Sequence, residues 1–423
     1  MLYKEAELMN LAAVKLLCGP PQEFLHLPSE KYKLQVLAVH SSRFILNLSD
    51  TTAANTMAIA SVRAHMRFLI KYNLEKRVAT SEVLSEPILA IAAGKLLLDD
   101  KDKYKKSMQI LVEDLIISDK IISLGDRWET VARMILIVNR DATVHAAGGQ
   151  ICILDFSGDT QKITANGGTQ RYLEANQDYA VRPFTLDSYL RNLVDPAKIS
   201  QLDGAFDSGL DWATGVHMNF THFVQLEDFV GPYLSSEFLI ACWRKGYALQ
   251  FISIQPIIDM LLIGYRGDLH KPFDHKMFVF VALQVRNRVK AAELELINTI
   301  TCPFLRICSE SENWKPEYMV ILMDMGTSAH FKDSGGQVHI TKQAAAKGEA
   351  WFGFQEAKEY PAVRISIRGL EPYISLAEWA PAILDLQRPR KREEMFFSTL
   401  DDALASNLRF AEGALTLPTE EIF

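Results

Sequence analysis

The segment Phe251–Arg288, FISIQPIIDMLLIGYRGDLHKPFDHKMFVFVALQVRNR, decides the fold of the chain around it. It contains two apolar runs, Pro256–Ile263 and Met277–Val285, which are rich in Ile, Val, Leu and Phe. Each run has the length of one strand, and a polar connector with Gly and Pro separates them. This pattern predicts two neighbouring buried strands.

Polar side chains interrupt both runs. Asp259 lies in the middle of the first run, where a carboxylate that loses water needs a cation, a metal ion or several hydrogen-bond donors. The second run ends in Gln284 and Arg286, and these two project to one face because strand side chains alternate. The sequence therefore predicts an acid on one strand that faces an amide and a cation on the next.

Such a set of side chains matches the needs of phosphodiester hydrolysis, in which oxygen ligands hold a divalent cation and a positive group stabilises charge on phosphorus. The pair IIDMLLI and FVALQVRN resembles the restriction-endonuclease-like (PD-(D/E)XK) nuclease superfamily. It is most similar to the nuclease-like domain of fungal, mobile-element-associated proteins of the Crinkler and retrotransposon-hot-spot type. The resemblance covers Phe220–Gly326 best and Lys31–Leu98 more loosely.

This superfamily places an Asp on its second core strand and a Glu-x-Lys or Gln-x-Lys on its third. The resemblance thus implies Asp259 as a metal ligand and catalytic residue, Gln284 as the second ligand or its orienter, and Arg286 in the place of the catalytic lysine. An acid on the first core helix often completes the metal site, which implies Glu237 as a further ligand. The implied cofactor is Mg²⁺ or Mn²⁺.

The chain departs from the family pattern at Arg286. Lysine can lose its proton when it is buried, whereas arginine stays charged and presents a planar fork. Two interpretations therefore stay open. The chain is either a nucleic-acid-directed nuclease with a weakened Asp259, Gln284 and Arg286 centre, or a non-catalytic interaction or scaffold protein on a decayed nuclease fold. In the second, Asp259 is a structural residue that bonds to Arg286 or to backbone amides, and Glu237 is an acid favoured by its helix dipole.

Composition sets further bounds. The chain has 423 residues, enough for two or three domains. Its composition, 48% hydrophobic and 23% charged, is typical of a globular protein, and its net charge is −7. It has no apolar run of the roughly 20 residues that a membrane helix needs, and Glu5 and Glu7 are unlike a signal peptide. We expect an intracellular protein, nuclear or cytoplasmic, with no membrane partner and with its five cysteines reduced.

The local charge around the two runs is reversed. Between Ile240 and Lys290 there are eight Lys or Arg against three Asp, which suits a phosphate backbone, although a solvated surface gives the same count. We expect nucleic acid, DNA rather than RNA, as the partner. The side chains expected to contact it are Arg244, Lys245, Arg266, Lys271 and Arg288. Neither GxxxxGK[ST] nor GxGxxG occurs, so the chain has no nucleotide-binding motif of these kinds.

The predicted fold class is α+β, with a helical N-terminal half followed by a restriction-endonuclease-like α-β-β-β-α-β core. The expected units are a helical domain (1–140), a mixed Gly-rich connecting region (141–219), the core (220–330) and a C-terminal extension that packs on the core (331–423).

Periodicity and capping signals predict the individual elements. Helices are expected over Lys4–Leu17, Glu30–Leu46, Ala53–Tyr72, Lys106–Leu124, Arg127–Val138, Leu234–Lys245, Val289–Ile300, Thr341–Lys347 and Ile374–Leu384. Further strands are expected over Ile151–Phe156, Phe220–Glu227, Tyr247–Ile254, Met319–Met325, Trp351–Phe354 and Ala362–Ile367.

Overall fold

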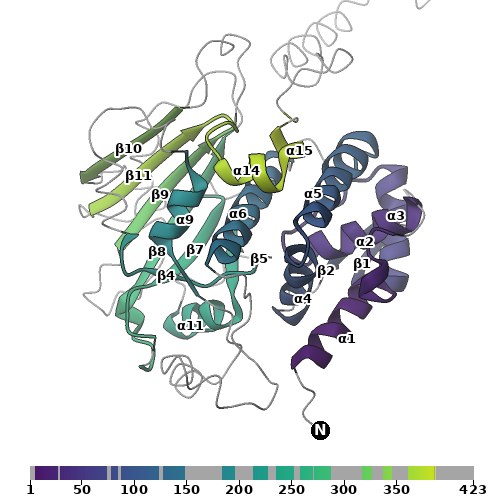
Figure 1. Ribbon diagram of the computed structural model, residues 1–423, viewed down its shortest axis with the longest axis horizontal. Helices are drawn as coiled ribbons and strands as arrows, with labels where there is room; N and C mark the ends of the chain where they lie inside the picture. Colours follow the sequence, from purple (N-terminus) through teal and green to yellow (C-terminus); the bar gives the residue numbers. More distant parts are fainter. Residues whose placement is uncertain are drawn as a thin grey trace, which may run out of the picture.

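The chain is a mixed α/β protein in which a group of helices lies beside a curled sheet (Figure 1). The computed structural model describes residues 5–26, 29–73, 78–83, 87–122, 127–147, 183–195, 213–226, 235–251, 258–269, 271–286, 317–325, 337–344, 361–384 and 386. None of the helices in these ranges is both long and apolar enough to cross a membrane.

The first part of the chain is mainly helical. Local caps define several of its ends: the Thr51 side chain accepts from the Ala54 N–H, and the Asp100 carboxylate accepts from the N–H groups of the first turn of the next helix. The helical elements are α1 (Glu5–Leu17), η1 (Pro21–Glu23), α2 (Ser29–Ser41), α3 (Thr52–Ala64), α4 (Pro87–Leu98), α5 (Lys101–Gln109), the π-helix η2 (Ile110–Ser118) and α6 (Arg127–Ala146).

The helix predicted over Ala53–Tyr72 is wrong beyond Ala64. Met66 has a φ of 56°, and the chain then forms strand β1 (Arg67–Asn73), which pairs antiparallel with β2 (Val78–Val83). A contact distant in sequence explains the difference, because the buried Arg67 side chain donates to both the hydroxyl and the carbonyl oxygen of Ser81. That contact requires the extended backbone of a strand.

The second part of the chain forms a nine-stranded sheet within the described residues. The main path is β10-β11-β9-β8-β7-β4-β3, and β6 pairs with both β7 and β5. The strands are β3 (Phe184–Thr185), β4 (His217–Met218), β5 (His222–Gln225), β6 (Tyr247–Gln250), β7 (Met260–Tyr265), β8 (Phe278–Arg286), β9 (Glu317–Asp324), β10 (Gln337–Ala344) and β11 (Pro361–Arg368). The helical elements here are α9 (Leu186–Leu193), α11 (Ser236–Lys245), η4 (His275–Met277), α14 (Ile374–Trp379) and α15 (Pro381–Leu384).

The two apolar runs of the central segment form neighbouring buried strands, as predicted. Strand β7 pairs antiparallel with β8, and Met260 is the partner of Leu283. Strands β8, β9 and β11 are parallel to one another, whereas β6 and β10 run antiparallel to their neighbours β7 and β11. The carboxyl ends of three parallel strands and the start of β7 therefore lie at one edge of the sheet.

The helix predicted over Thr341–Lys347 is wrong, because Gln337–Ala344 pairs along its full length with β11 as strand β10. Its Val, Ile and Thr residues suit a strand, and pairing with β11 satisfies its backbone. The predictions over Ile151–Phe156, Val289–Ile300 and Trp351–Phe354 lie outside the described residues.

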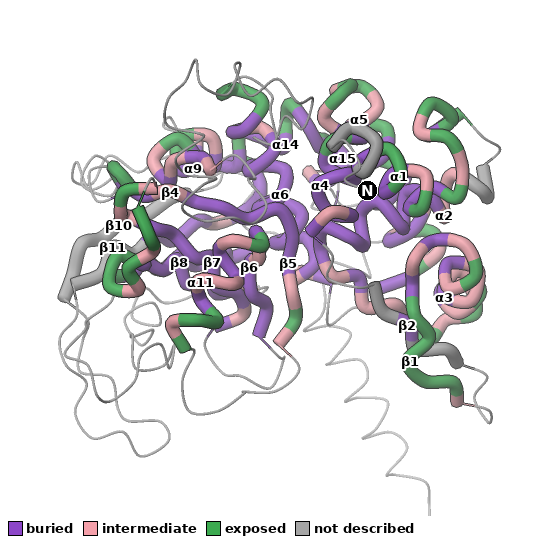
Figure 2. The backbone as a smooth tube through the Cα atoms, turned by 90° about the horizontal axis from the view of Figure 1, so that it is seen from below, coloured by how far each residue is buried: buried purple, intermediate pink, exposed green. Residues whose placement is uncertain are grey.

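The two faces of the sheet pack against different helices. On one face, which we call the α6 face, Met260, Leu283 and Ile321 belong to a hydrophobic cluster that continues through α6 into the N-terminal helices. On the other, the α11 face, Leu261 and Phe280 pack with side chains of α11. Helix α6 consequently lies between the sheet and the other N-terminal helices (Figure 1), and it is buried along most of its length (Figure 2).

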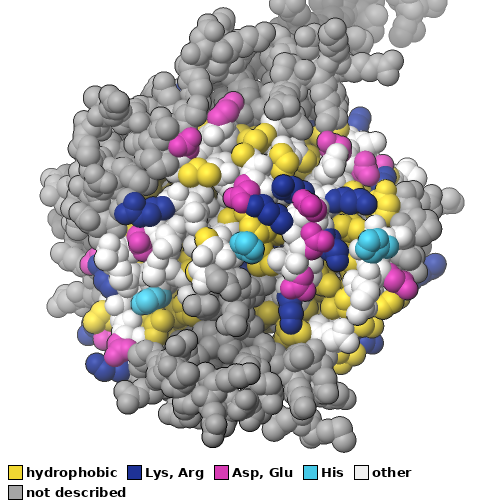
Figure 3. Space-filling model, viewed as in Figure 1, with side chains coloured by type: hydrophobic (Ala, Val, Ile, Leu, Met, Phe, Trp, Pro, Cys, Tyr) yellow, Lys and Arg dark blue, Asp and Glu magenta, His cyan; other side chains and the backbone are white. Residues whose placement is uncertain are grey.

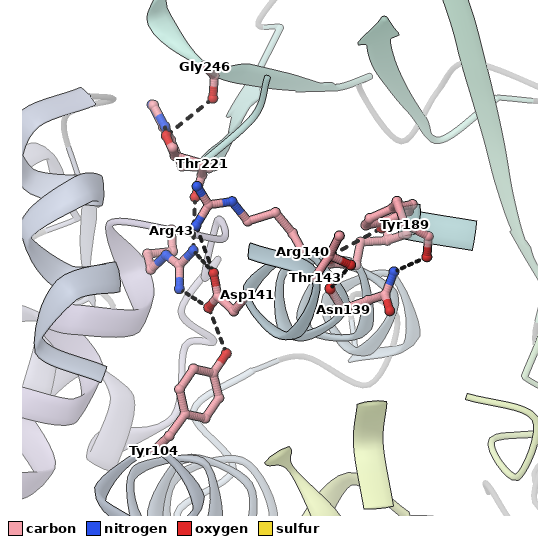
Figure 4. Close-up of polar contacts among 11 residues, drawn as sticks. Arg43, Tyr104, Asn139, Arg140, Asp141, Thr143, Tyr189, Thr221 and Gly246 are labelled. Carbon is pink, nitrogen blue, oxygen red and sulfur yellow. Dashed lines mark hydrogen bonds and ion pairs between the residues drawn. The ribbon is translucent and has the colours of Figure 1, made fainter. Parts of the chain in front are cut away.

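A buried ionic network links α6 to both sides (Figure 4). The Arg43 guanidinium, which follows α2, forms a two-pronged ion pair with Asp141 of α6, and its Nη2 also donates to the Thr221 carbonyl oxygen at 3.4 Å. Asp141 accepts from the Tyr104 hydroxyl at 3.0 Å and from Arg140 Nη1 at 2.9 Å. Burial alone would raise the pKa of Asp141, but the charges of Arg43 and Arg140 lower it below its usual value.

Two buried histidines flank this network. The His40 ring contacts the Ser107 hydroxyl at 2.8 Å, and the His222 ring contacts the Thr221 hydroxyl at the same distance. Burial, assisted by the charge of Arg43, lowers the pKa of both rings to about 3. Both histidines are therefore neutral at pH 7.

The first prediction concerns the buried carboxylate. Asp141→Asn should lower the free energy of unfolding by about 3–5 kcal/mol, because it leaves buried guanidinium groups without their counter-charge. Asp119→Asn is the matched control: it breaks the partly exposed Lys33–Asp119 pair, at 2.8 Å, and should cost less than about 1 kcal/mol. Urea denaturation measures both, and equal costs would contradict the assigned role of Asp141.

The second prediction is a loss of stability in acid. The unfolded chain takes up protons on His40 and His222 below about pH 6.5, whereas the folded chain does so only near pH 3. Stability is therefore complete above pH 6.5 and falls as the pH falls. Between pH 7 and pH 5 each histidine should cost about 2 kcal/mol. His40→Gln should flatten this slope in urea denaturation; an unchanged slope would show that His40 titrates normally.

Candidate functional site

The predicted catalytic residues meet at one edge of the sheet. Asp259 directly precedes β7, and Gln284 and Arg286 end β8. Arg286 is in register with Asp324 of β9, and Asp324 is in register with Arg368 of β11. We call Arg286, Asp324 and Arg368 the edge row.

Sequence analysis missed Asp324 and Arg368 of the edge row. Each ends an apolar strand run, as Arg286 does, and that repeated position is the signal that could have identified them. Asp324 is buried, and its carboxylate lies 3.9 Å from Arg368 Nε. Cationic and anionic groups therefore alternate across three strands.

Asp259 faces away from Gln284, contrary to the prediction. Its N–H donates to the Leu283 carbonyl oxygen at 2.9 Å, although Met260 already pairs with Leu283. Two residues of one strand opposite one residue of the next is the pattern of a β-bulge, which redirects a side chain. Ile258 packs on the α11 face and Met260 on the α6 face, so Asp259 turns toward α6 together with Met260.

The Asp259 carboxylate hydrogen-bonds to the backbone of the neighbouring strand β8. Its Oδ2 accepts from the Val285 backbone N–H at 2.5 Å. Burial raises the pKa of Asp259, while the Val285 N–H and the charges of Arg286 and of Arg133 on α6 oppose that rise. Asp259 and Arg286, both within the described residues, form no ion pair with each other, so Arg286 acts on this carboxylate only through its charge.

Gln284 lies on the opposite side of the strand. Phe278, Phe280 and Ala282 of the same strand face α11, and alternation places Gln284 with them. The side chain is 2% exposed, and its Oε1 is buried without a hydrogen-bond partner. An amide oxygen can bind a cation, but this side chain is on the α11 face, whereas Asp259 turns toward α6.

Glu237 is not part of this edge. It is exposed in the first turn of α11, and its pKa is lowered by its own backbone N–H, then by the Ser235 side chain and, more weakly, by His275. His275 lies just before the start of β8, where Phe278 pairs with Tyr265. Tyr265 is six residues from Asp259, about 20 Å along the strand. The predicted metal ligand Glu237 therefore lies at the other end of the sheet.

The predicted nucleic-acid contacts also gather away from Asp259. The Arg244 guanidinium lies 5.6 Å from the Phe273 ring centroid, and the Lys245 amine lies 5.8 Å from that of Tyr247. Two further cations are paired with acids: Arg266 with Glu317 at 2.5 Å and Lys271 with Asp268 at 3.6 Å. Arg288 lies outside the described residues. Arg244 and Lys245 end α11, and Arg266 and Lys271 follow the end of β7, whereas Asp259 precedes its start.

These residues do not fit a Mg²⁺ or Mn²⁺ centre. Such ions need several oxygen ligands on one side of a site, whereas Oδ2 of Asp259 accepts a hydrogen bond from the Val285 N–H, Gln284 is on the other face and Glu237 is at the far end of the sheet. Within the described ranges, no three His, Cys, Asp or Glu side chains converge as a metal-binding group. We therefore derive no catalytic step through a metal ion.

Comparison with known proteins finds no matching family model, no similar curated protein and no similar solved structure. The resemblance to the restriction-endonuclease-like superfamily therefore stays a prediction that rests on the residues of this chain.

The third prediction separates a structural from a metal-binding role for Asp259. Asp259→Asn keeps an oxygen that can accept from Val285 and removes a buried charge, so it should change the free energy of unfolding by less than about 1 kcal/mol. Asp259→Ala leaves the Val285 N–H unpaired and should cost about 1–3 kcal/mol. Thermal and urea denaturation, with and without Mn²⁺, measure both. A Tm that Mn²⁺ raises in the parent but not in Asp259→Asn would contradict the structural role.

Proposed function

We propose that this chain is a non-catalytic interaction protein built on a decayed nuclease-type fold. The order of elements supports a restriction-endonuclease-like core. Helix α11 is followed by β6, β7 and β8 and, after residues 287–316, by β9. Asp259 begins the second of these strands, and Gln284 and Arg286 end the third, which are the positions of the family motif.

The proposal that the chain is non-catalytic rests on one observation. The carboxylate of Asp259, which would hold the metal ion, accepts a hydrogen bond from the Val285 N–H of the neighbouring strand. A nuclease with this motif must present its Asp and its Glu or Gln to the same ion. The bulge at Asp259 turns these oxygens to opposite faces, and the bulky Arg286 replaces a lysine. The set therefore resembles a nuclease centre in position but not in geometry.

Nucleic-acid binding without cleavage is a second candidate function, and the surface around α11 favours it. Arg244 and Lys245 lie beside the rings of Phe273 and Tyr247, and cations next to aromatic rings are typical of surfaces that bind single strands. Figure 3 shows acidic and basic side chains interspersed among the described residues of the face that it draws.

The fourth prediction tests the absence of cleavage, which both candidate functions share, with supercoiled plasmid and single-stranded RNA in Mg²⁺ or Mn²⁺. The parent chain, Asp259→Ala and Arg286→Lys should all fail to nick DNA or to cut RNA, because the oxygen ligands are divided between two faces of the sheet. Cutting by the parent that Asp259→Ala abolishes would contradict the proposed function.

Fluorescence anisotropy with labelled oligonucleotides then decides between the two candidates. If the α11 surface binds nucleic acid, Arg244→Ala with Lys245→Ala should weaken binding at least about tenfold, a change of about 1.4 kcal/mol. The charge-matched control, Lys95→Ala with Lys106→Ala, removes two exposed lysines elsewhere and should leave binding unchanged. No binding by the parent in low salt would leave protein partners as the targets of this chain.

A further inference from the structure

Strand β1 exposes an unusual amount of apolar surface. The five consecutive residues Phe68–Tyr72 are all exposed. Four of them are large hydrophobic side chains: Phe68 is 45% exposed, Leu69 49%, Ile70 58% and Tyr72 43%. Among the described residues, the other exposed large hydrophobic side chains are Leu11, Phe238, Met277 and Ile374, which are scattered over other elements. The concentration in one strand therefore calls for an explanation.

The position of β1 leaves one of its edges open. It belongs to a separate two-stranded sheet, in which β2 is its neighbour, and helix α3 contacts both strands. In the part of the chain that the structure describes, no strand pairs with the other edge of β1, and the hairpin lies at the periphery of the molecule (Figure 2). The register steps from Leu69 to Lys71, so Ile70 has no partner residue in β2. An open apolar edge is a template for another strand.

We propose that β1 pairs antiparallel with β1 of a second copy of this chain, so that the two hairpins form one four-stranded sheet across a two-fold axis. Neighbouring strand residues point to opposite faces, and Phe68–Tyr72 are all exposed, so apolar side chains are exposed on both faces of β1 even though helix α3 contacts the hairpin. A flat partner surface would cover only one face. A strand added at the edge covers apolar side chains on both faces, and β1 of a second copy carries the same side chains.

The area involved sets the strength of this dimer. Four half-exposed side chains of this size offer roughly 350 Å² of apolar surface per copy. Two copies together offer about 700 Å², below the 1,200–2,000 Å² of a standard stable interface. Backbone pairing along the edge adds to the apolar contact. Lys71, the only Lys, Arg, Asp or Glu among residues 68–72, opposes very close packing. The dimer should therefore be weak and dependent on concentration.

The fifth prediction tests this pairing by sedimentation velocity of the full chain over a hundredfold range of concentration. The parent should shift from monomer to dimer within that range. Ile70→Lys places a charge on the open edge and should raise the dissociation constant at least about tenfold. Ile374→Lys is the matched control, because Ile374 is 39% exposed on another element and its replacement should leave the dimer unchanged.

Circular dichroism and the Tm establish that each variant is folded, which is expected because both side chains are exposed. A parent that stays monomeric throughout, or variants that weaken the dimer equally, would overturn the proposal. So would a monomeric parent that sediments with phosphatidylcholine and phosphatidylserine vesicles through Ile70, because the strand would then bind lipid. The proposal is independent of the function proposed above, since neither Asp259, nor the edge row, nor any residue of α11 takes part.

Discussion

The packing of the described N-terminal helices against the sheet depends on the buried ion pair between Arg43 and Asp141. Burying two charges is costly, and the cost is offset only when the geometry is good and further hydrogen bonds are made. Here Tyr104 and Arg140 donate further hydrogen bonds to the Asp141 carboxylate, and Arg43 donates to the Thr221 carbonyl oxygen beside the sheet. The Phe223 N–H also donates to the Arg43 carbonyl oxygen at 2.8 Å. One guanidinium thereby sets where the N-terminal helices and the sheet meet.

The sheet edge shows how a small backbone irregularity changes chemistry. A bulge at Asp259 moves a carboxylate from the face of Gln284 to the face of α6, where it accepts from Val285 and lies near the charge of Arg133. The order of the elements and the spacing of the motif are unaffected. The side chain of Asp259 therefore contributes to the pairing of β7 with β8.

The buried strands β7 and β8 and helix α11 were predictable because apolar runs and cap residues act locally. The strand that begins at Arg67 was not predictable, because its stability depends on contacts with the distant residue Ser81, whereas the local periodicity allows a helix. The face of Asp259 was not predictable either, because one inserted residue reverses which side chains point inward. Asp324 meets Arg368, and Asp141 meets Arg43, only through pairings between segments far apart in sequence, which periodicity does not contain.

The most direct test of the central claim, that Asp259 holds the sheet together and does not hold a metal ion, is a crystal structure from crystals soaked in Mn²⁺, with an anomalous difference map. The account predicts no anomalous peak at Asp259, whose Oδ2 accepts from the Val285 N–H. A peak bound by Asp259 together with Gln284 would contradict it and establish a nuclease-type metal centre.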